Sequence, residues 1–195
     1  QPEAVDGYLY PGYYLPEDRA KRISGLMDAK SDWDKEAISK MIFDNTSSVA
    51  TGVVQNLIAN LDTKTISAEE KEVLNVLKAW KGTTNLEDVA PTIYNKWIYL
   101  YLKNTFEDEM GKEDFNIFLG THLGKQIIAR QIVNENSLWW DNIKTKNVKE
   151  TRNQIVSKSF HDAVSQLTTQ LGNTIADWNW SKVHTVEHEH PLGKV

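Results

Sequence analysis

The sequence contains no cysteine among its 195 residues. This excludes disulfide bonds, thiolate metal sites and a cysteine nucleophile. Long runs of Lys or Arg are also missing, and 22 basic against 27 acidic residues give a net charge of −5. We therefore expect no nucleic-acid partner, because a phosphate-binding surface needs clustered positive charge. No apolar stretch approaches the roughly 20 residues that span a bilayer, so no membrane partner is expected either.

Short catalytic signatures are missing as well. There is no G-x-S-x-G nucleophile elbow and no Gly-rich phosphate loop. The acidic run Glu107-Asp108-Glu109 could supply a pair of carboxylates for glycoside chemistry, but a charge run at a helix end is usually solvated, and we interpret it so. The opening QPEAVDGYLYPGYY does not resemble a signal peptide, so for an exported protein the signal is expected upstream of Gln1.

The patterns that are present predict a mainly α fold. Apolar residues recur at spacings of three and four, and Ser67 with Glu70 forms a capping-box pattern (S-x-x-E). We expect residues 1–195 to form a single helical region, with a loop over 1–15, helices over 16–175 and an extended segment over 177–195. The expected helices cover residues 16–30, 34–61, 67–80, 92–110, 113–134 and 149–172, the last ending at Gly172.

Two of these helices have unusual patterns. Residues 92–110 are apolar nearly all round, which predicts burial on several sides and suggests a body larger than this chain. The stripe of 34–61 is interrupted by the polar residues 44–48. They could line a site, but a solvated or capped turn is the simpler interpretation, and we expect the turn.

The last residues change character. Trp178, Trp180, Val183 and Val186 suggest a strand, and the chain offers it no partner strand. We therefore expect this segment to be interrupted at its C-terminus.

Three histidines lie in the same segment and could form a metal site. His184, His188 and His190 follow the pattern H-x3-H-x-H. On a strand, however, His188 and His190 share one face, which is a weak arrangement for a metal. We expect strand histidines and no metal.

Four stretches resemble the β chain of the penicillin amidase (penicillin acylase) family. They are similar to its Tyr/Pro loop with the helix that follows, to one of its helices, to its Trp-Trp-Asp loop and to its W-x-W-x-x-x-H…H-P-L-G signature. They occur in the family's order and span nearly the whole chain: YPGYYLPEDRAKRI (Tyr10–Ile23), IFDNTSSVA (Ile42–Ala50), SLWWDNIKTKNVKETRNQIV (Ser137–Val156) and DWNWSKVHTVEHEHPLG (Asp177–Gly193).

The resemblance implies a periplasmic N-terminal nucleophile hydrolase with an αββα core. In such enzymes the precursor cleaves itself and exposes a serine, whose own α-amine serves as the base. A backbone N–H and an Asn side chain stabilise the oxyanion. The implied substrates are acylated amines such as penicillins, other β-lactams and acyl-homoserine lactones. This chain would be a helical subdomain beside that core, and the remainder of its precursor (α chain and β core) would be its partner.

The sequence departs from the family pattern at its start. Position 1 is Gln, and neither the nucleophilic serine nor the oxyanion Asn, expected just upstream, is present. We therefore expect the chain to be inactive by itself. Only Arg19 aligns with a family active-site position, an Arg that organises the substrate pocket, with Arg22 as a nearby competitor. The alternative is that Arg19 only pairs with Glu17 or Asp18.

No cofactor or metal is expected in this segment. The resemblance implies that calcium is possible in the full-length enzyme, with ligands mostly outside this segment and Asp6 the nearest candidate here. A stand-alone helical binding or interaction module remains the alternative function. The hydrolase hypothesis predicts a large exposed apolar patch, or self-association that covers it, whereas a module predicts neither.

Overall fold

The structure is a computed structural model that describes residues 7–8, 17–186 and 193. Its described part consists of helices and loops without a strand element, as the mainly α prediction requires. The elements are α1 (Asp18–Asp28), α2 (Lys35–Ile42), α3 (Ala50–Ala59), α4 (Ala68–Ala79), α5 (Ala90–Leu119), α6 (His122–Val133), η1 (Leu138–Trp140), α7 (Arg152–Leu171), η2 (Ile175–Asp177) and η3 (Trp180–Lys182).

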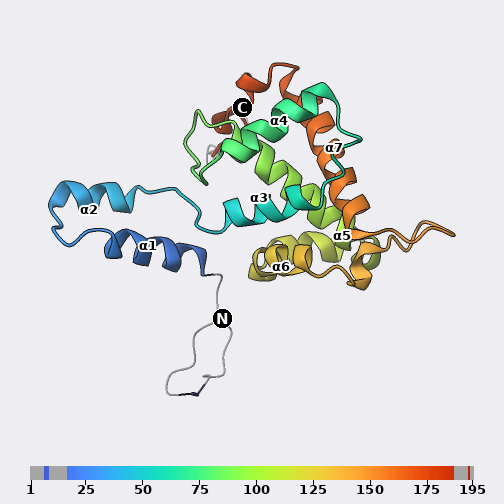
Figure 1. Cartoon of the computed structure of the whole chain (residues 1–195), viewed down its shortest axis with the longest axis horizontal. Coiled ribbons are helices and arrows are strands. Elements are labelled where there is room, and N and C mark those ends of the chain that lie inside the picture. Colours follow the sequence, from blue (N-terminus) through green and yellow to red (C-terminus); the bar gives the residue numbers. More distant parts are fainter. Residues whose placement is uncertain (1–6, 9–16, 187–192, 194–195) are drawn as a thin grey trace.

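Helix α5 lies at the centre of the body and packs against α4, α6 and α7 (Figure 1). Trp97 of α5 and Phe160 of α7 are both fully buried, with ring centroids 4.7 Å apart. The burial predicted for residues 92–110 is thus confirmed for most of their apolar side chains, although Tyr99 is exposed. The chain's own helices provide it, so this helix does not require a larger body.

The predicted boundary between the helices 92–110 and 113–134 is confirmed as a kink at Gly111, although the helix is a single element, α5, on both sides of it. α5 continues past residue 110, with an interruption at Gly111 (φ 77°, ψ 161°) that only glycine adopts easily. The expected helix 113–134 is then broken at Gly120 and Thr121, where α5 ends and α6 begins.

The predicted helix 34–61 is also wrong as one element. It is two helices, α2 and α3, separated by the polar residues 44–48. Short polar side chains bond nearby backbone groups and so compete with helix formation, which explains why the helix stops there. The expectation of a capped turn is confirmed.

Local capping signals place two helix ends as predicted. Both hydrogen bonds of the capping box between Ser67 and Glu70 are formed at the start of α4. Gly172 follows α7 with φ 89°, a conformation that disfavours any residue with a side chain. A second capping box, Thr151 with Gln154, begins α7.

The expected extended segment over 177–195 needs correction where it is described. Residues 175–182 contain the short helices η2 and η3, and Trp178 is fully buried with its indole N–H donating to the carbonyl of Gly172. The backbone N–H groups of Trp180 and Ser181 donate to the carbonyls of Asp88 and Leu86. The tryptophans therefore anchor a turn onto the body. Residues 187–192, 194 and 195 lie outside the described residues, as do 1–6 and 9–15 of the expected opening loop.

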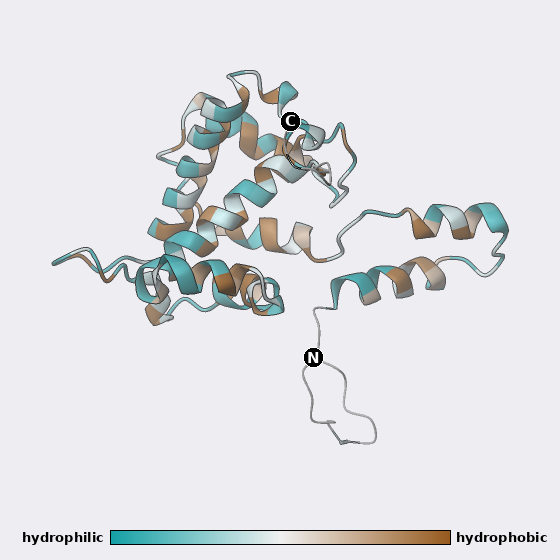
Figure 2. Cartoon of the chain, turned by 180° about the vertical axis from the view of Figure 1, so that it is seen from behind, coloured by the Kyte–Doolittle hydropathy of each residue, from teal (hydrophilic) through white to brown (hydrophobic). Residues whose placement is uncertain are grey.

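Helices α1 and α2 form a hairpin that projects from the body (Figure 1, blue). Neither helix has a buried residue, whereas each of α3 to α7 buries three or more. The hairpin carries hydrophobic stretches on its surface (Figure 2). In the described part of the chain, no helix combines the length and apolarity that crossing a membrane demands.

Candidate functional site

The candidate site lies where the start of α1 meets the loop 43–49. Asp18 stands in the first turn of α1, and its carboxylate accepts hydrogen bonds from the hydroxyl of Ser47 (2.6 Å) and the backbone N–H groups of Ser48 (2.6 Å) and Val49 (3.2 Å). The Ser47 hydroxyl in turn accepts from the N–H of Ala50. Because the first N–H groups of a helix have no partner inside it, these contacts cap α3.

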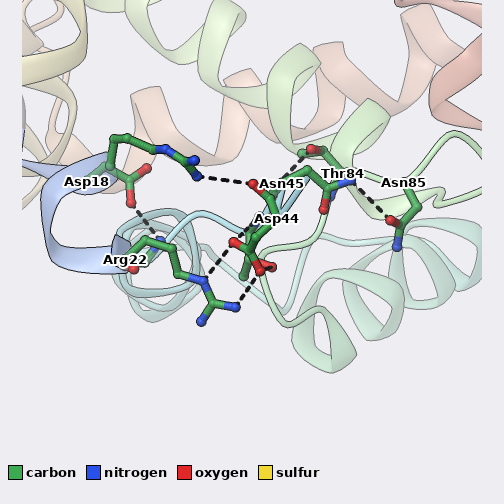
Figure 3. Close-up of polar contacts among 9 residues, drawn as sticks. Asp18, Arg22, Asp44, Asn45, Thr84 and Asn85 are labelled. Atoms are coloured by element: carbon green, nitrogen blue, oxygen red, sulfur yellow. Dashed lines mark hydrogen bonds and ion pairs between the residues drawn. The ribbon is translucent and has the colours of Figure 1, made fainter. Parts of the chain in front are cut away.

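Arg22 and Asp44 form a bidentate ion pair in the same region (Figure 3). The Arg22 Nε donates to Oδ1 of Asp44 at 2.8 Å and Nη2 donates to Oδ2 at 2.6 Å. Both side chains are partly buried, with 30% and 16% of their surface exposed. The Arg22 hydrogen bonds, helped by the N–H and hydroxyl of Thr46, lower the pKa of the Asp44 carboxyl to about 2.

The side chain of Arg19 also binds Asp44, at its backbone carbonyl. Its Nη1 donates to the carbonyl oxygen of Asp44 at 3.1 Å, and its side chain is exposed. Glu17 and Asp18 were the alternative partners expected for Arg19. Glu17 instead forms an ion pair with Lys21, and Asp18 caps α3. Asp44 is therefore the residue that brings Arg19 and Arg22 together.

The loop 43–49 is also tied to the loop that follows α4. Thr84 donates to the carbonyl of Asn45, and Asn45 donates to the side chain of Asn85 (Figure 3). The N–H of Ser47 donates to the carbonyl of Gly82, which has φ 88°. A Cβ at residue 82 would lie 2.5 Å from the carbonyl oxygen of Ser47, so only glycine fits.

Comparison with known proteins identifies the chain. The family described as penicillin amidase matches residues 2–195. The chain belongs to the penicillin amidase family. Curated relatives include an acyl-homoserine lactone acylase, QuiP, of Pseudomonas aeruginosa, 26% identical over 96% of this chain. Two proteins of the same name from Pseudomonas fluorescens, strains Pf0-1 and Pf-5, are 24% and 23% identical over 99% and 95% of the chain. The chain spans about a quarter of the length of these relatives.

The guanidinium of Arg19 in this penicillin amidase chain makes fewer hydrogen bonds to Asp44 than that of Arg22. It is exposed and uses one hydrogen bond to Asp44. A guanidinium has five N–H donors and no acceptor, so it suits a carbonyl or carboxylate oxygen. It cannot act as a nucleophile or as a base at neutral pH.

One arrangement elsewhere looks like a catalytic relay but is structural. Nε2 of His161 lies 3.3 Å from the hydroxyl of Thr65, and its Nδ1 lies 2.6 Å from Oε1 of Glu70. The Thr65 hydroxyl, however, donates to the carbonyl of Asp62, and Glu70 already caps α4. His161 of α7 therefore ties the start of α4 to the body. Sequence reasoning did not find this contact, because its members are 91 and 96 residues apart.

The histidine and calcium candidates do not form a metal site in the described residues. There, no group of three or more His, Asp or Glu side chains could hold a metal ion. The ring of His184 stacks on that of Trp180, with centroids 4.7 Å apart and planes at 10°. His188, His190 and Asp6 lie outside the described residues, so their roles stay predictions.

The solvated interpretation of the acidic run is wrong for Glu109. Asp108 accepts a hydrogen bond from the N–H of Ile143, and Oε2 of Glu109 is buried without a hydrogen-bond partner among the described residues. Burial raises the pKa of Glu109 to about 7, and the neighbouring carboxylates of Asp108 and Asp141 act in the same direction. Asp108 thereby anchors the loop 141–150 on α5, a role with no signal in the sequence.

Proposed function

We propose that this chain is part of an acylase that hydrolyses the amide bond of acylated amines, with acyl-homoserine lactones as the preferred substrate class. The observation that carries the proposal is the penicillin amidase match over residues 2–195. The substrate class is suggested by the relatives, which are acyl-homoserine lactone acylases. β-Lactam amides such as penicillins form the second class that the family name suggests.

In the proposed reaction the nucleophile comes from sequence outside this chain. The hydroxyl of an N-terminal serine attacks the amide carbonyl, and its α-amine accepts the hydroxyl proton. The tetrahedral intermediate collapses to an acyl-enzyme, and the leaving nitrogen takes the proton and departs as the free amine. Water then attacks the ester with the same α-amine as base, releasing the fatty acid and restoring the serine.

Within this scheme Arg19 helps to organise the substrate pocket. Two observations support this role: the Arg19 side chain is exposed, and its hydrogen bond to the Asp44 carbonyl fixes the position of the guanidinium. The remaining N–H donors are left to face a substrate oxygen. Arg22 is the less suitable candidate, because Asp44 takes its Nε and Nη2. We assign Arg22 to positioning the loop and Arg19 to the substrate.

The test compares the complete gene product with this chain alone. Each is incubated with an acyl-homoserine lactone, and the released homoserine lactone is measured by mass spectrometry. We expect turnover by the complete product and none by the chain. In the complete product, Arg19→Ala should reduce kcat/KM about tenfold or more, while Lys21→Ala on the same helix should not. Turnover by residues 1–195 alone, or none by the complete product on any acylated amine, would overturn the proposal.

The stand-alone module remains the second candidate, and the buried core of the body does not decide between the two. A contiguous buried cluster runs from α3 to η2, so independent folding is expected under both hypotheses. A natural gene product limited to residues 1–195 that binds a partner without hydrolysis would favour the module. The periplasmic location and a calcium ion in the full-length enzyme stay predictions that rest on the family resemblance.

A further inference from the structure

The loop 141–150 projects from the body between η1 and α7 (Figure 1, orange), and the view from behind shows the same projection (Figure 2). Residues 143–149 are all exposed, whereas 141, 142 and 150 at the base of the loop are half-buried. Among the described residues, Asn147 in this loop is the one non-glycine residue with a positive φ, at 64°. We call residues 143–149 the finger.

Hydrogen bonds at the base hold the finger in shape. The carboxylate of Asp108 in α5 accepts from the N–H of Ile143 at 2.8 Å. The carboxylate of Glu150 accepts from the N–H of Asn142 at 3.1 Å and from the hydroxyl of Thr145 at 2.8 Å. Contacts to α5 and across the loop thus make the finger a defined projection of the body.

The same contacts separate the charges of the loop. The carboxylates of Asp108, Asp141 and Glu150 accept from backbone N–H groups at the base. The charged side chains of the finger are all positive, and they form no ion pair with another described residue: Lys144, Lys146 and Lys149. The finger is therefore a local positive surface on a chain whose net charge is −5.

Apolar side chains stand among these lysines. Ile143 and Val148 of the finger are exposed by 62% and 56%. Leu138 and Trp139 of η1, just before the loop, are exposed by 78% and 39%. Lysines combined with exposed apolar and Trp side chains are typical of segments that attach to anionic lipid surfaces.

We propose that the finger, together with Leu138 and Trp139, binds the surface of an anionic lipid bilayer. The lysines meet the negative headgroups, while Ile143 and Val148 enter the boundary between the headgroups and the acyl chains. Such binding stays at the surface of the bilayer, so it does not need the spanning helix that the described residues lack. The inference does not depend on the proposed acylase activity.

The size of this surface favours a bilayer over a protein partner. The finger and the two η1 residues supply fewer than half of the roughly 20–30 residues that each side of a stable protein interface contributes. A bilayer sets no such minimum, because each lysine near an anionic surface adds attraction of its own. Nucleic acid is less suitable, since its phosphate backbone offers no apolar layer to Ile143 and Val148.

Vesicle binding by the complete gene product tests the proposal. Sedimentation with vesicles of phosphatidylglycerol and phosphatidylcholine in equal parts is compared with sedimentation with phosphatidylcholine alone, at low salt. We expect binding to the anionic vesicles only. The finger variant, with all three lysines reversed (K144E, K146E and K149E), should bind them at least about tenfold more weakly.

The matched control reverses three exposed lysines on other parts of the chain: K35E in α2, K64E in the loop after α3 and K71E in α4. It changes the net charge by the same amount as the finger variant. Because attraction to the headgroups acts over a short distance, we expect the control to lose at most about twofold. No binding of the unaltered protein to anionic vesicles, or an equal loss in both variants, would overturn the proposal.

A second variant tests the apolar part of the contact. Ile143→Ser with Val148→Ser should weaken vesicle binding about fivefold or more and leave its decline with added salt unchanged, because no charge is removed. Unchanged affinity of this variant would overturn the insertion of the finger.

The remaining outcomes distinguish other partners. Poly-glutamate that binds as tightly as the anionic vesicles, and as tightly after the serine replacements, would assign the finger to an acidic protein and overturn the proposal. Acetylation of the finger lysines that is slower than that of Lys64 and Lys71, without vesicles, would show that the rest of the polypeptide covers the finger and would also overturn it. Vesicle binding by a complete product that hydrolyses no acyl amide would support the finger and overturn only the proposed activity.

Discussion

The carboxylate of Asp18 lies 2.6 Å from the hydroxyl of Ser47, 29 residues further along the chain. One acidic side chain in the first turn of α1 thereby caps the start of α3, for which Val49 provides no side-chain cap of its own. Helices α1 and α3 are thus fixed to each other by a cap from a residue that is distant in the sequence.

Replacing this carboxylate should destabilise the fold. We expect Asp18→Ala to lower the free energy of unfolding by about 1–2 kcal/mol, the typical cost of losing a helix cap. Asp28→Ala, at the other end of α1, removes a negative charge from a helix C-terminus and should have little effect or stabilise slightly. Urea unfolding of both variants checks this. Equal effects of the two would contradict the capping role.

The Arg22–Asp44 pair should contribute stability that depends on pH. The pKa of Asp44 is lowered from its usual 3.8 to about 2, so its contribution is present above pH 4 and is lost as the pH falls through 2. At pH 7 we expect Asp44→Asn to cost about 1–2 kcal/mol, below the full value of the shift because Arg22 is partly solvated. The difference from wild type in urea unfolding should shrink between pH 4 and pH 2. A penalty independent of pH would contradict this account.

Gly82 should not tolerate a side chain. Its positive φ and the 2.5 Å approach to the Ser47 carbonyl predict that Gly82→Ala destabilises the chain by about 2 kcal/mol or more. Gly52 is the matched control, because it lies in α3 with open space around it. Gly52→Ala should stabilise by about 0.5–1 kcal/mol. Thermal unfolding followed by circular dichroism measures both, and two changes of the same sign would argue against the loop contact.

Glu109 should make the chain less stable as the pH rises. Its pKa is raised from 4.5 to about 7, so the folded state holds a proton that the unfolded state has lost, and stability declines between pH 4.5 and 7. Glu109→Gln mimics the protonated form, and we expect it to be neutral near pH 4 and stabilising by about 1 kcal/mol at pH 8. Guanidinium unfolding at the two pH values gives the comparison. A variant that is less stable than wild type at pH 8 would contradict the burial of this charge.

Local signals in the sequence predicted those features that depend on neighbouring residues. The capping box at Ser67 and the stop at Gly172 are of this kind, because the interacting groups lie within a few residues of each other. The family resemblance was confirmed over nearly the whole chain. Most of the apolar residues of 92–110 also predicted their own burial, with Tyr99 as the exposed exception.

Features that depend on distant partners could not be predicted in this way. The polar residues 44–48 predicted a turn, but the partners that hold this turn in place, Asp18, Arg22 and Gly82, are not close to it in sequence. The alternation after residue 177 suggested a strand, but Trp178 finds a buried site against the end of α7. Arg19 was identified only through the family resemblance, and its contact with Asp44 has no local signature.

The central claim is that the bond-breaking serine lies outside these residues. Labelling the complete gene product with a serine-directed sulfonyl fluoride, followed by peptide mapping, tests it most directly. We predict stoichiometric loss of acyl-amide hydrolysis, with the label on an N-terminal serine in a peptide outside residues 1–195. A label on a serine or threonine within residues 1–195 that tracks with the loss of activity would contradict the account.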